Sequence, residues 1–326
     1  MKITSLIIVC VSFLALSAPS TAQQCNPAPK NVASLKEIRP QSFTVEGPLA
    51  EFDPCHTSVK LQRPLFSNKP PLMIIVHGGG GVDLATRNAA DAFRNKGFAS
   101  LFFDSYEHNG FNQGFSFWGS RATNEARQRM IYKVTLSAYE WALKRDDINT
   151  NQIYFYGVSN GGAVLANIAG AVSQTHVKGV FAEGTPGAGL GLPDQLNVPL
   201  RMIYGKLDNY GGRSEDEMIW LRQDPCFTNT ASFIHPKGNA LTCNGLVNSG
   251  GRAAKPIDWY EEQKKKGADV EVWFYDNAAH GIFLGPIQKN MITYGADLRR
   301  FAWVGADASA RSKLLDDIMQ HYTARK

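Results

Sequence analysis

The sequence has little cysteine, a small charge imbalance and few long apolar runs. These shortages argue against a zinc site, a nucleic-acid-binding surface and a membrane-spanning protein, respectively. The formal net charge is +5 over 326 residues. The one tight basic cluster, Lys264-Lys265-Lys266, follows Glu261 and Glu262, so a solvated helix face explains it better than a nucleic-acid site. The Cys and His residues lack zinc-site spacing, so neither a metal nor another cofactor is expected.

The longest apolar run lies close to the start of the chain. It covers residues 6–16, follows Lys2, and precedes small residues that end at Ala22, which predicts a signal peptide over residues 1–22. A retained membrane anchor is the weaker alternative, because a spanning helix needs about 20 residues. The mature chain, residues 23–326, is therefore expected to be a soluble protein away from the membrane, secreted or periplasmic.

The cysteines suggest disulfide bonds. Cys10 belongs to the leader, and four cysteines follow it. An even number in an exported chain is typical of a disulfide-bonded protein. Three pairings are possible, and proximity in the sequence favours Cys25–Cys55 and Cys226–Cys243.

Short apolar runs alternate with helical patterns along most of the chain. Strands are expected over 72–76, 99–103, 153–156, 177–182, 200–204 and 270–275, and helices over 88–96, 123–144, 160–171, 257–266 and 314–322. This alternation predicts a mainly parallel sheet covered by helices on both faces, in three layers. Without repeats, low-complexity segments or a convincing boundary, residues 23–326 form one expected domain.

One motif carries a candidate nucleophile. Gly157-Val158-Ser159-Asn160-Gly161 fits Gly-x-Ser-x-Gly, follows an apolar strand and precedes a helix of small residues. A sharp strand-to-helix turn would expose the Ser159 hydroxyl, while the glycines would avoid clashes with the neighbouring strand and helix. The backbone N–H of Asn160, at the start of that helix, is a candidate oxyanion donor. A Gly-rich turn without chemistry is the alternative.

A serine nucleophile needs a base and an acid. His280 follows the last predicted strand by a short loop and is the candidate base. Asp208 follows the strand over 200–204 and is the candidate acid, with Glu183 as its rival at the end of the preceding strand.

A glycine run after the strand over 72–76 offers a second oxyanion donor. His77 is followed by four glycines, of which Gly79 and Gly80 are the candidates for that N–H. A phosphate-binding loop is the competing interpretation, but Val82-Asp83 does not supply the residues that such a loop requires.

At these motifs the chain resembles the dienelactone hydrolase family of α/β-hydrolases, over roughly residues 71–282. The likeness also includes Lys96-Gly97-Phe98-Ala99, Phe103-Asp104-Ser105-Tyr106, Tyr204-Gly205-Lys206-Leu207-Asp208 and Ala279-His280-Gly281-Ile282-Phe283. The resemblance implies the α/β-hydrolase fold, with Ser159 as nucleophile, Asp208 as acid and His280 as base. The best-known members carry Cys at the nucleophile position, so Ser159 favours a general ester hydrolase over dienelactone as substrate.

The sequence therefore predicts a secreted serine hydrolase that cleaves small-molecule carboxylic esters through an acyl-enzyme. A prolyl-oligopeptidase-like peptidase and a catalytically silent binding protein on the same fold are the alternatives. Phe111, Phe115, Phe117 and Trp118 are expected either to line an apolar acyl or alcohol pocket or to pack in the core, and the sequence favours neither. Residues 210–255 exceed what the fold requires and predict an insertion at the rim of the site, or a distant surface flap.

Overall fold

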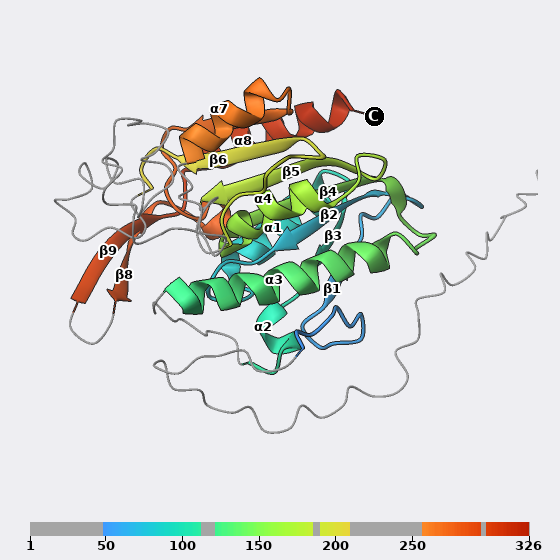
Figure 1. The fold of residues 1–326 in the computed structure, drawn as a ribbon, viewed down its shortest axis with the longest axis horizontal. Coiled ribbons are helices and arrows are strands. Elements are labelled where there is room, and N and C mark those ends of the chain that lie inside the picture. The colour runs from blue at the N-terminus through green and yellow to red at the C-terminus, as the bar shows by residue number, and fades with distance from the viewer. Residues whose placement is uncertain (1–47, 112–120, 185–189, 209–255, 295–297, 326) are drawn as a thin grey trace, which may run out of the picture.

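The computed structural model describes residues 48–111, 121–184, 190–208, 256–294 and 298–325. Their main feature is a seven-stranded sheet in the order β1-β3-β2-β4-β5-β6-β7 (Figure 1). Its strands are β1 (Lys60–Gln62), β2 (Pro71–Val76), β3 (Ala99–Phe102), β4 (Asn149–Ser159), β5 (Val177–Gly184), β6 (Leu200–Gly205) and β7 (Val270–Tyr275). Only β1 runs antiparallel to its neighbour, and every other pairing in this sheet is parallel.

Helices cover both faces of the sheet and complete a three-layer α/β arrangement. One face carries α1 (Leu84–Asn95) and α8 (Ala308–Thr323), and the other carries α2 (Ser105–His108), α3 (Arg121–Ala142), α4 (Asn160–Ala171) and α7 (Pro256–Lys265). The predicted α/β-hydrolase fold is confirmed, because a mainly parallel sheet runs into a sharp β4–α4 turn and carries helices on both faces.

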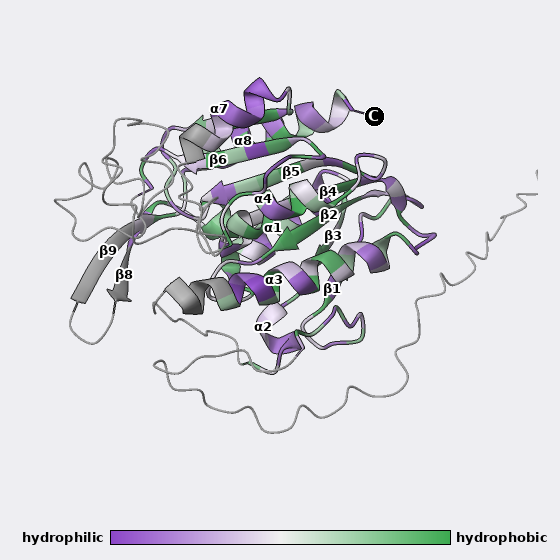
Figure 2. Cartoon of the chain, viewed as in Figure 1, coloured by the Kyte–Doolittle hydropathy of each residue, from purple (hydrophilic) through white to green (hydrophobic). Residues whose placement is uncertain are grey.

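The continuous apolar run of β2 shows how the two cores form. Leu72 and Ile74 point into the core beneath α3 and α4, while Met73 and Ile75 point into the core beneath α1 and α8. All four are buried, as expected for a parallel strand that is covered on both faces. The inner strands are accordingly hydrophobic, whereas α7 at the outside is largely hydrophilic (Figure 2).

Several element boundaries differ from those expected from the sequence. Helix α1 begins at Leu84 rather than residue 88, because the Asp83 side chain accepts the Thr86 N–H at 3.0 Å and caps an earlier turn. Helix α3 spans Arg121–Ala142, so it begins and ends two residues earlier than the expected 123–144. Strand β4 starts at Asn149 and extends to Ser159, beyond the apolar residues that marked it.

The sequence did not predict the hairpin that follows the last sheet strand. Strands β8 (Gln288–Tyr294) and β9 (Leu298–Val304) pair antiparallel and extend beyond the main sheet (Figure 1). The end of β9 returns to the body, where Val304 forms a bridge with His280. The backbone of His280, the candidate general base, is therefore bonded to the end of the hairpin that joins the body. The short helix η3 (Ile282–Leu284) follows directly after this turn.

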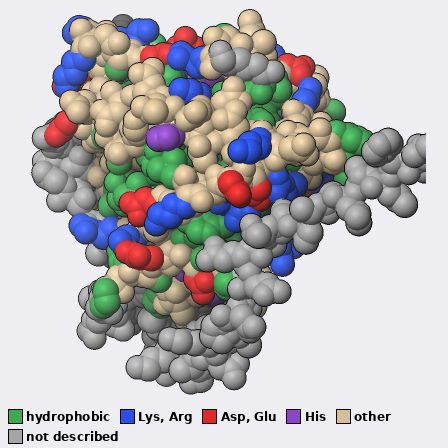
Figure 3. Space-filling model, turned by 90° about the vertical axis from the view of Figure 1, so that its right-hand side faces the viewer, with side chains coloured by type: hydrophobic (Ala, Val, Ile, Leu, Met, Phe, Trp, Pro, Cys, Tyr) green, Lys and Arg blue, Asp and Glu red, His purple; other side chains and the backbone are tan. Residues whose placement is uncertain are grey.

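The mild excess of basic residues is not gathered on the face seen in Figure 3. There, Lys and Arg side chains lie next to Asp and Glu side chains, with hydrophobic side chains between them. In the described part of the chain, no helix is both long enough and apolar enough to cross a membrane.

Core burial makes a direct prediction about stability. Leu72→Ala, at a fully buried position of β2, should lower the free energy of unfolding by about 2–5 kcal/mol, because the lost side chain leaves a cavity between the sheet and its helices. Urea denaturation followed by circular dichroism measures the change. The matched control is Leu65→Ala, whose side chain is 90% exposed and should alter stability little. Equal losses in the two variants would contradict the assigned core.

Candidate active site

The candidate nucleophile lies on a strained turn at the centre of the sheet. Strand β4 ends at Ser159, and α4 begins at the next residue. Ser159 has φ 58° and ψ −121°, a conformation that residues other than glycine rarely adopt. Such strain persists only where the surrounding contacts hold it, and here it lifts the side chain out of the strand-to-helix turn.

Two glycines allow α4 to start so close to the sheet. A Cβ on Gly161 would lie 2.4 Å from the carbonyl oxygen of Val76 at the end of β2. A Cβ on Gly162 would lie 2.2 Å from the carbonyl oxygen of Glu183 near the end of β5. The first turn of α4 is therefore held between the strands on either side of β4, as the Gly-x-Ser-x-Gly motif predicted.

The candidate base and acid are joined by a direct hydrogen bond. Asp208 follows β6, His280 follows β7, and Nδ1 of His280 lies 2.9 Å from Oδ2 of Asp208. Both residues are buried. An ionised carboxylate can only accept, so Nδ1 carries the proton and Nε2 is the ring nitrogen that can act as a base.

Burial and the neighbouring carboxylate act in opposite directions on His280. Desolvation lowers the pKa of the imidazole, because it disfavours the charged form. The charge of Asp208 and its hydrogen bond outweigh this effect, with a further contribution from Glu183, and the pKa is raised above its ordinary value. The site therefore stabilises an imidazolium, which is what a base becomes once it has accepted a proton.

The loops that carry acid and base are also tied through their backbones. The Leu207 N–H donates to the carbonyl of Ala278 at 2.8 Å, and the Lys206 N–H donates to the carbonyl of Tyr275 at 3.0 Å. Gly205 permits this contact, since a Cβ there would lie 2.4 Å from the Ala278 oxygen. Asp208 and His280 thus meet because β6 and β7 are neighbours whose carboxyl ends lie at the same edge of the sheet.

Gly184 connects this pair to the nucleophile. A Cβ on Gly184 would lie 3.1 Å from Cε1 of His280 and 3.3 Å from the backbone N of Ser159. The imidazole ring and the nucleophile's backbone therefore border the same glycine. The structure brings together all three residues of the predicted triad, from the ends of β4, β6 and β7.

The glycine run lies against the nucleophile, as expected for an oxyanion loop. A Cβ on Gly78 would lie 3.3 Å from Cβ of Ser159, and a Cβ on Gly79 would lie 3.0 Å from Nδ2 of Asn160. A Cβ on Gly80 would meet nothing within 4 Å, so this residue borders open space. Of the two predicted glycine donors, Gly79 therefore lies against the start of α4.

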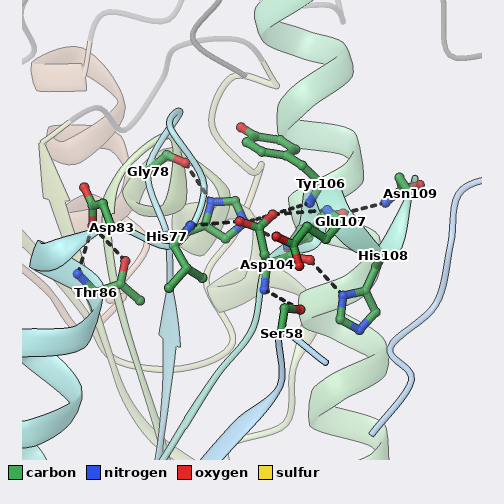
Figure 4. A network of polar contacts seen from close by, with 12 residues as sticks. Ser58, His77, Gly78, Asp83, Thr86, Asp104, Tyr106, Glu107, His108 and Asn109 are labelled. Carbon is green, nitrogen blue, oxygen red and sulfur yellow. Dashed lines mark hydrogen bonds and ion pairs between the residues drawn. The ribbon is translucent and has the colours of Figure 1, made fainter. Parts of the chain in front are cut away.

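Buried polar residues hold the glycine loop in place (Figure 4). His77 Nε2 accepts the Ser105 N–H at 2.9 Å, and its Nδ1 lies 2.7 Å from the Gly78 carbonyl. Asp104 Oδ2 accepts the Val82 N–H at 2.9 Å, while Oδ1 caps α2. His77 and Asp104 thus have structural roles at the ends of their strands, and both are fully buried.

Gln128 is a site residue that sequence reasoning missed. Its Nε2 donates to Oδ1 of Asn160 at 3.0 Å, and its Oε1 accepts the Leu190 N–H at 2.9 Å. It thereby fixes the side chain beside the nucleophile from helix α3. Glutamine on a long helix carries no sequence signal of such a role, since only the packing of α3 against α4 buries it.

Glu183, the rival for the acid, lies near the pair but bonds elsewhere. Its Oε1 accepts the Ile282 N–H at 2.7 Å, and its Oε2 accepts the hydroxyl of Tyr156. Burial raises the pKa of Glu183 to about 7, and the two hydrogen bonds act against this rise. The direct partner of His280 is thus Asp208.

Other expectations fall on parts of the chain outside the described residues. These are the signal peptide, Cys25, Cys226 and Cys243, the insertion over 210–255, and Phe115, Phe117 and Trp118. Both favoured disulfides include at least one such cysteine and stay predictions. Phe111 is described, and it packs partly buried against the core beneath α3. In the described ranges, no group of three or more His, Cys, Asp and Glu side chains is placed to hold a metal ion.

Comparison with known proteins finds likeness in structure only. No protein-family model and no curated protein matches the chain. Similar solved structures include a dienelactone hydrolase-like promiscuous phosphotriesterase, P91, from metagenomic libraries. It shares 15% identity, covers 79% of this chain and 88% of its own, and has a TM-score of 0.47.

Two further solved structures are esterases. Est1E from Butyrivibrio proteoclasticus, with ferulic acid bound, shares 14% identity at 82% and 95% coverage, with a TM-score of 0.45. Esterase 2 from Thermogutta terrifontis shares 14% at 82% and 88% coverage, with a TM-score of 0.42. The three solved structures are thus described as one dienelactone hydrolase-like protein and two esterases. At such identities and scores, the likeness does not indicate an activity, because one fold hosts many functions.

The hydrogen bond to His280 predicts which carboxylate matters more. Asp208→Asn should lower kcat by about 10⁴-fold, because an amide can donate to Nδ1 and would favour the wrong imidazole tautomer. Glu183→Gln should cost far less, since Glu183 does not bond to the ring. Steady-state kinetics on an activated ester, with circular dichroism to confirm folding, gives the ranking. The reverse order would move the acid to β5.

Proposed function

We propose that this protein is a serine hydrolase that cleaves small-molecule carboxylic esters through an acyl-enzyme intermediate. The single observation that supports this most strongly is the juxtaposition at three strand ends: Ser159 on a strained turn, next to a buried His280 that is hydrogen-bonded to Asp208. A positive φ at a serine, beside a paired histidine, is costly for folding alone and has a direct use in catalysis.

The proposed first half-reaction transfers the acyl group to the enzyme. Ser159 Oγ attacks the ester carbonyl carbon and gives its proton to Nε2 of His280. The carbonyl oxygen becomes an oxyanion, for which the N–H groups of Asn160 and of the glycine loop, Gly79 or Gly80, are the candidate donors. The C–O bond to the alcohol then breaks, and the departing oxygen takes the proton from His280.

The second half-reaction returns the enzyme to its starting state. Water gives a proton to Nε2 of His280 and attacks the acyl carbon. Ser159 leaves with that proton, and the carboxylic acid is released. Asp208 keeps its charge throughout and stabilises the imidazolium in both halves. The same residues could act on an amide bond. The alternative function as a peptidase therefore differs only in the leaving group, which is an amine instead of an alcohol.

Location in the cell is a separate part of the proposal. The apolar run over residues 6–16 and the small residues before position 23 support export to the periplasm or the medium. The residues concerned lie outside the described part of the structure. Amino-terminal sequencing of the protein recovered from its native host would test it.

The nucleophile makes the central prediction. Ser159→Ala should lower kcat for ester hydrolysis by about 10³-fold or more while leaving the fold intact, because no hydroxyl remains to form the acyl-enzyme. Ser67→Ala, at an exposed position, is the matched control and should behave as wild type. A fluorophosphonate probe should label wild type and Ser67→Ala but not Ser159→Ala.

Each competing function has its own outcome in this experiment. Wild-type protein that is folded yet unlabelled would support the silent binding protein. Labelling combined with faster cleavage of peptides than of esters, measured on matched panels, would support the peptidase. Near-normal turnover by folded Ser159→Ala would exclude the proposed nucleophile.

The raised pKa of His280 predicts the acidic limb of the pH profile. The base must be neutral to accept the serine proton, and a raised pKa keeps it protonated to higher pH. The value of kcat/KM should therefore fall with decreasing pH, with a midpoint above the ordinary histidine pKa of 6.5. Asp208→Asn should move this midpoint down, because it removes the charge that raises the pKa. A wild-type rate that stays flat from neutral pH to about 4 would contradict a histidine base.

A further inference from the structure

A second buried carboxyl group, besides that of Asp208, lies close to His280 and takes no part in the proposed reaction. Glu183 is the penultimate residue of β5 and is only 2% exposed. A carboxyl group in such a place is costly unless hydrogen bonds compensate for the lost water. An apolar side chain would fill the same space without this cost, so the carboxyl group calls for an explanation.

The register of β4 and β5 places Glu183 next to the nucleophile turn. Glu183 pairs with Val158, and Gly184 pairs with Ser159. The Glu183 carbonyl also lies against Gly162 in the first turn of α4, where a Cβ would come within 2.2 Å. The backbone of Glu183 is therefore immobilised by the element that carries the nucleophile.

The side chain of Glu183 reaches from there to the turn that carries the base. Its Oε1 accepts the Ile282 N–H, two residues after His280, and its Oε2 accepts the Tyr156 hydroxyl. Between His280 and Ile282, Gly281 has φ 72°, so the chain reverses sharply. A bond at Ile282 thus limits how far this turn, and the ring before it, can move away from Ser159.

Other bonds hold the opposite side of the same turn. The His280 N–H donates to the Trp303 carbonyl at 3.3 Å, and the His280 carbonyl accepts the Gly305 N–H at 2.8 Å. These contacts come from the base of the β8–β9 hairpin. Glu183 supplies a contact from the sheet side, which is the side that carries Ser159.

The charge of Glu183 also acts on His280. Glu183 contributes to the raised pKa of the imidazole, and His280 in turn lowers the pKa of Glu183. Three titratable groups from other segments interact directly with Glu183 or His280: Tyr156 on β4, Asp208 after β6 and Asp83 before α1. A fourth group, Tyr275 on β7, interacts with Tyr156. Above its own pKa of about 7, Glu183 therefore adds a second negative charge near the imidazole, besides that of Asp208.

We propose that Glu183 is a positioning residue for His280, which fixes the turn after the base against the nucleophile strand and supports the imidazolium with a second charge. The inference rests on the proposed function, because His280 must act as a base for its position to matter. It assigns Glu183 no contact with substrate.

Two substitutions separate the hydrogen bond from the charge. Glu183→Ala removes both and should lower the rate constant for fluorophosphonate labelling of Ser159 by up to about 100-fold at pH 8, since small misplacements of a reacting group are that costly. Glu183→Gln keeps an oxygen for the Ile282 N–H but loses the charge. It should keep most of the rate at pH 8 and move the midpoint of the acidic limb of kcat/KM to lower pH.

Leu72→Ala is the control for lost stability. Its buried side chain lies in β2 on the α3–α4 side of the sheet, so it should weaken folding without moving the pH midpoint. If Glu183→Ala does not fold, the pH profile of Glu183→Gln decides the question alone. A Glu183→Gln midpoint equal to that of wild type would overturn the inference, as would wild-type labelling by folded Glu183→Ala.

The same measurements separate a failure of the proposed serine hydrolase function from a failure of the role proposed for Glu183. Wild-type protein that fails to label would remove the proposed function and this inference together. Wild-type protein that labels at Ser159, while both Glu183 variants match it in rate and pH midpoint, would remove the inference alone.

Discussion

The contact between the first turn of α4 and the ends of the neighbouring strands is the constraint on which the site depends. Gly161 lies against the carbonyl groups of Val76, the last residue of β2, and of His77, which follows it. Gly162 lies against the carbonyl of Glu183 in β5. With α4 held so close, the chain has to turn within one residue, and Ser159 takes a positive φ. Core packing on both faces of the sheet supplies the free energy that this strain costs.

The other site residues follow from the same edge of the sheet. Parallel strands end together, so β6 delivers Asp208 and β7 delivers His280 beside the turn at the end of β4. Backbone bonds between the two loops then hold Asp208 and His280 beside each other. The glycine loop follows β2, on the other side of β4, and reaches Ser159 and Asn160 from there.

Burial gives this edge its electrostatic character. Water is largely excluded from His280, Asp208 and Glu183, so charges interact there more strongly than at the surface. The pKa of His280 is therefore raised, and the pKa of Glu183, which interacts with the imidazole, is about 7. His77 and Asp104 are buried as well, and their hydrogen bonds tie the glycine loop to the start of α2.

The sequence by itself determined the features that depend on local patterns. Apolar runs marked the six parallel strands, and the glycines around Ser159 marked the turn, because a sharp turn needs small residues at fixed spacing. The order of Ser159, Asp208 and His280, each at or just after the end of a predicted strand, marked the candidate triad. Tertiary structure decided what depends on distant partners. That Asp208 rather than Glu183 bonds to His280 depended on the positions of β5 and β6. The contact of Gln128 with Asn160 depended on α3 packing on α4, and strands β8 and β9 depended on each other as pairing partners.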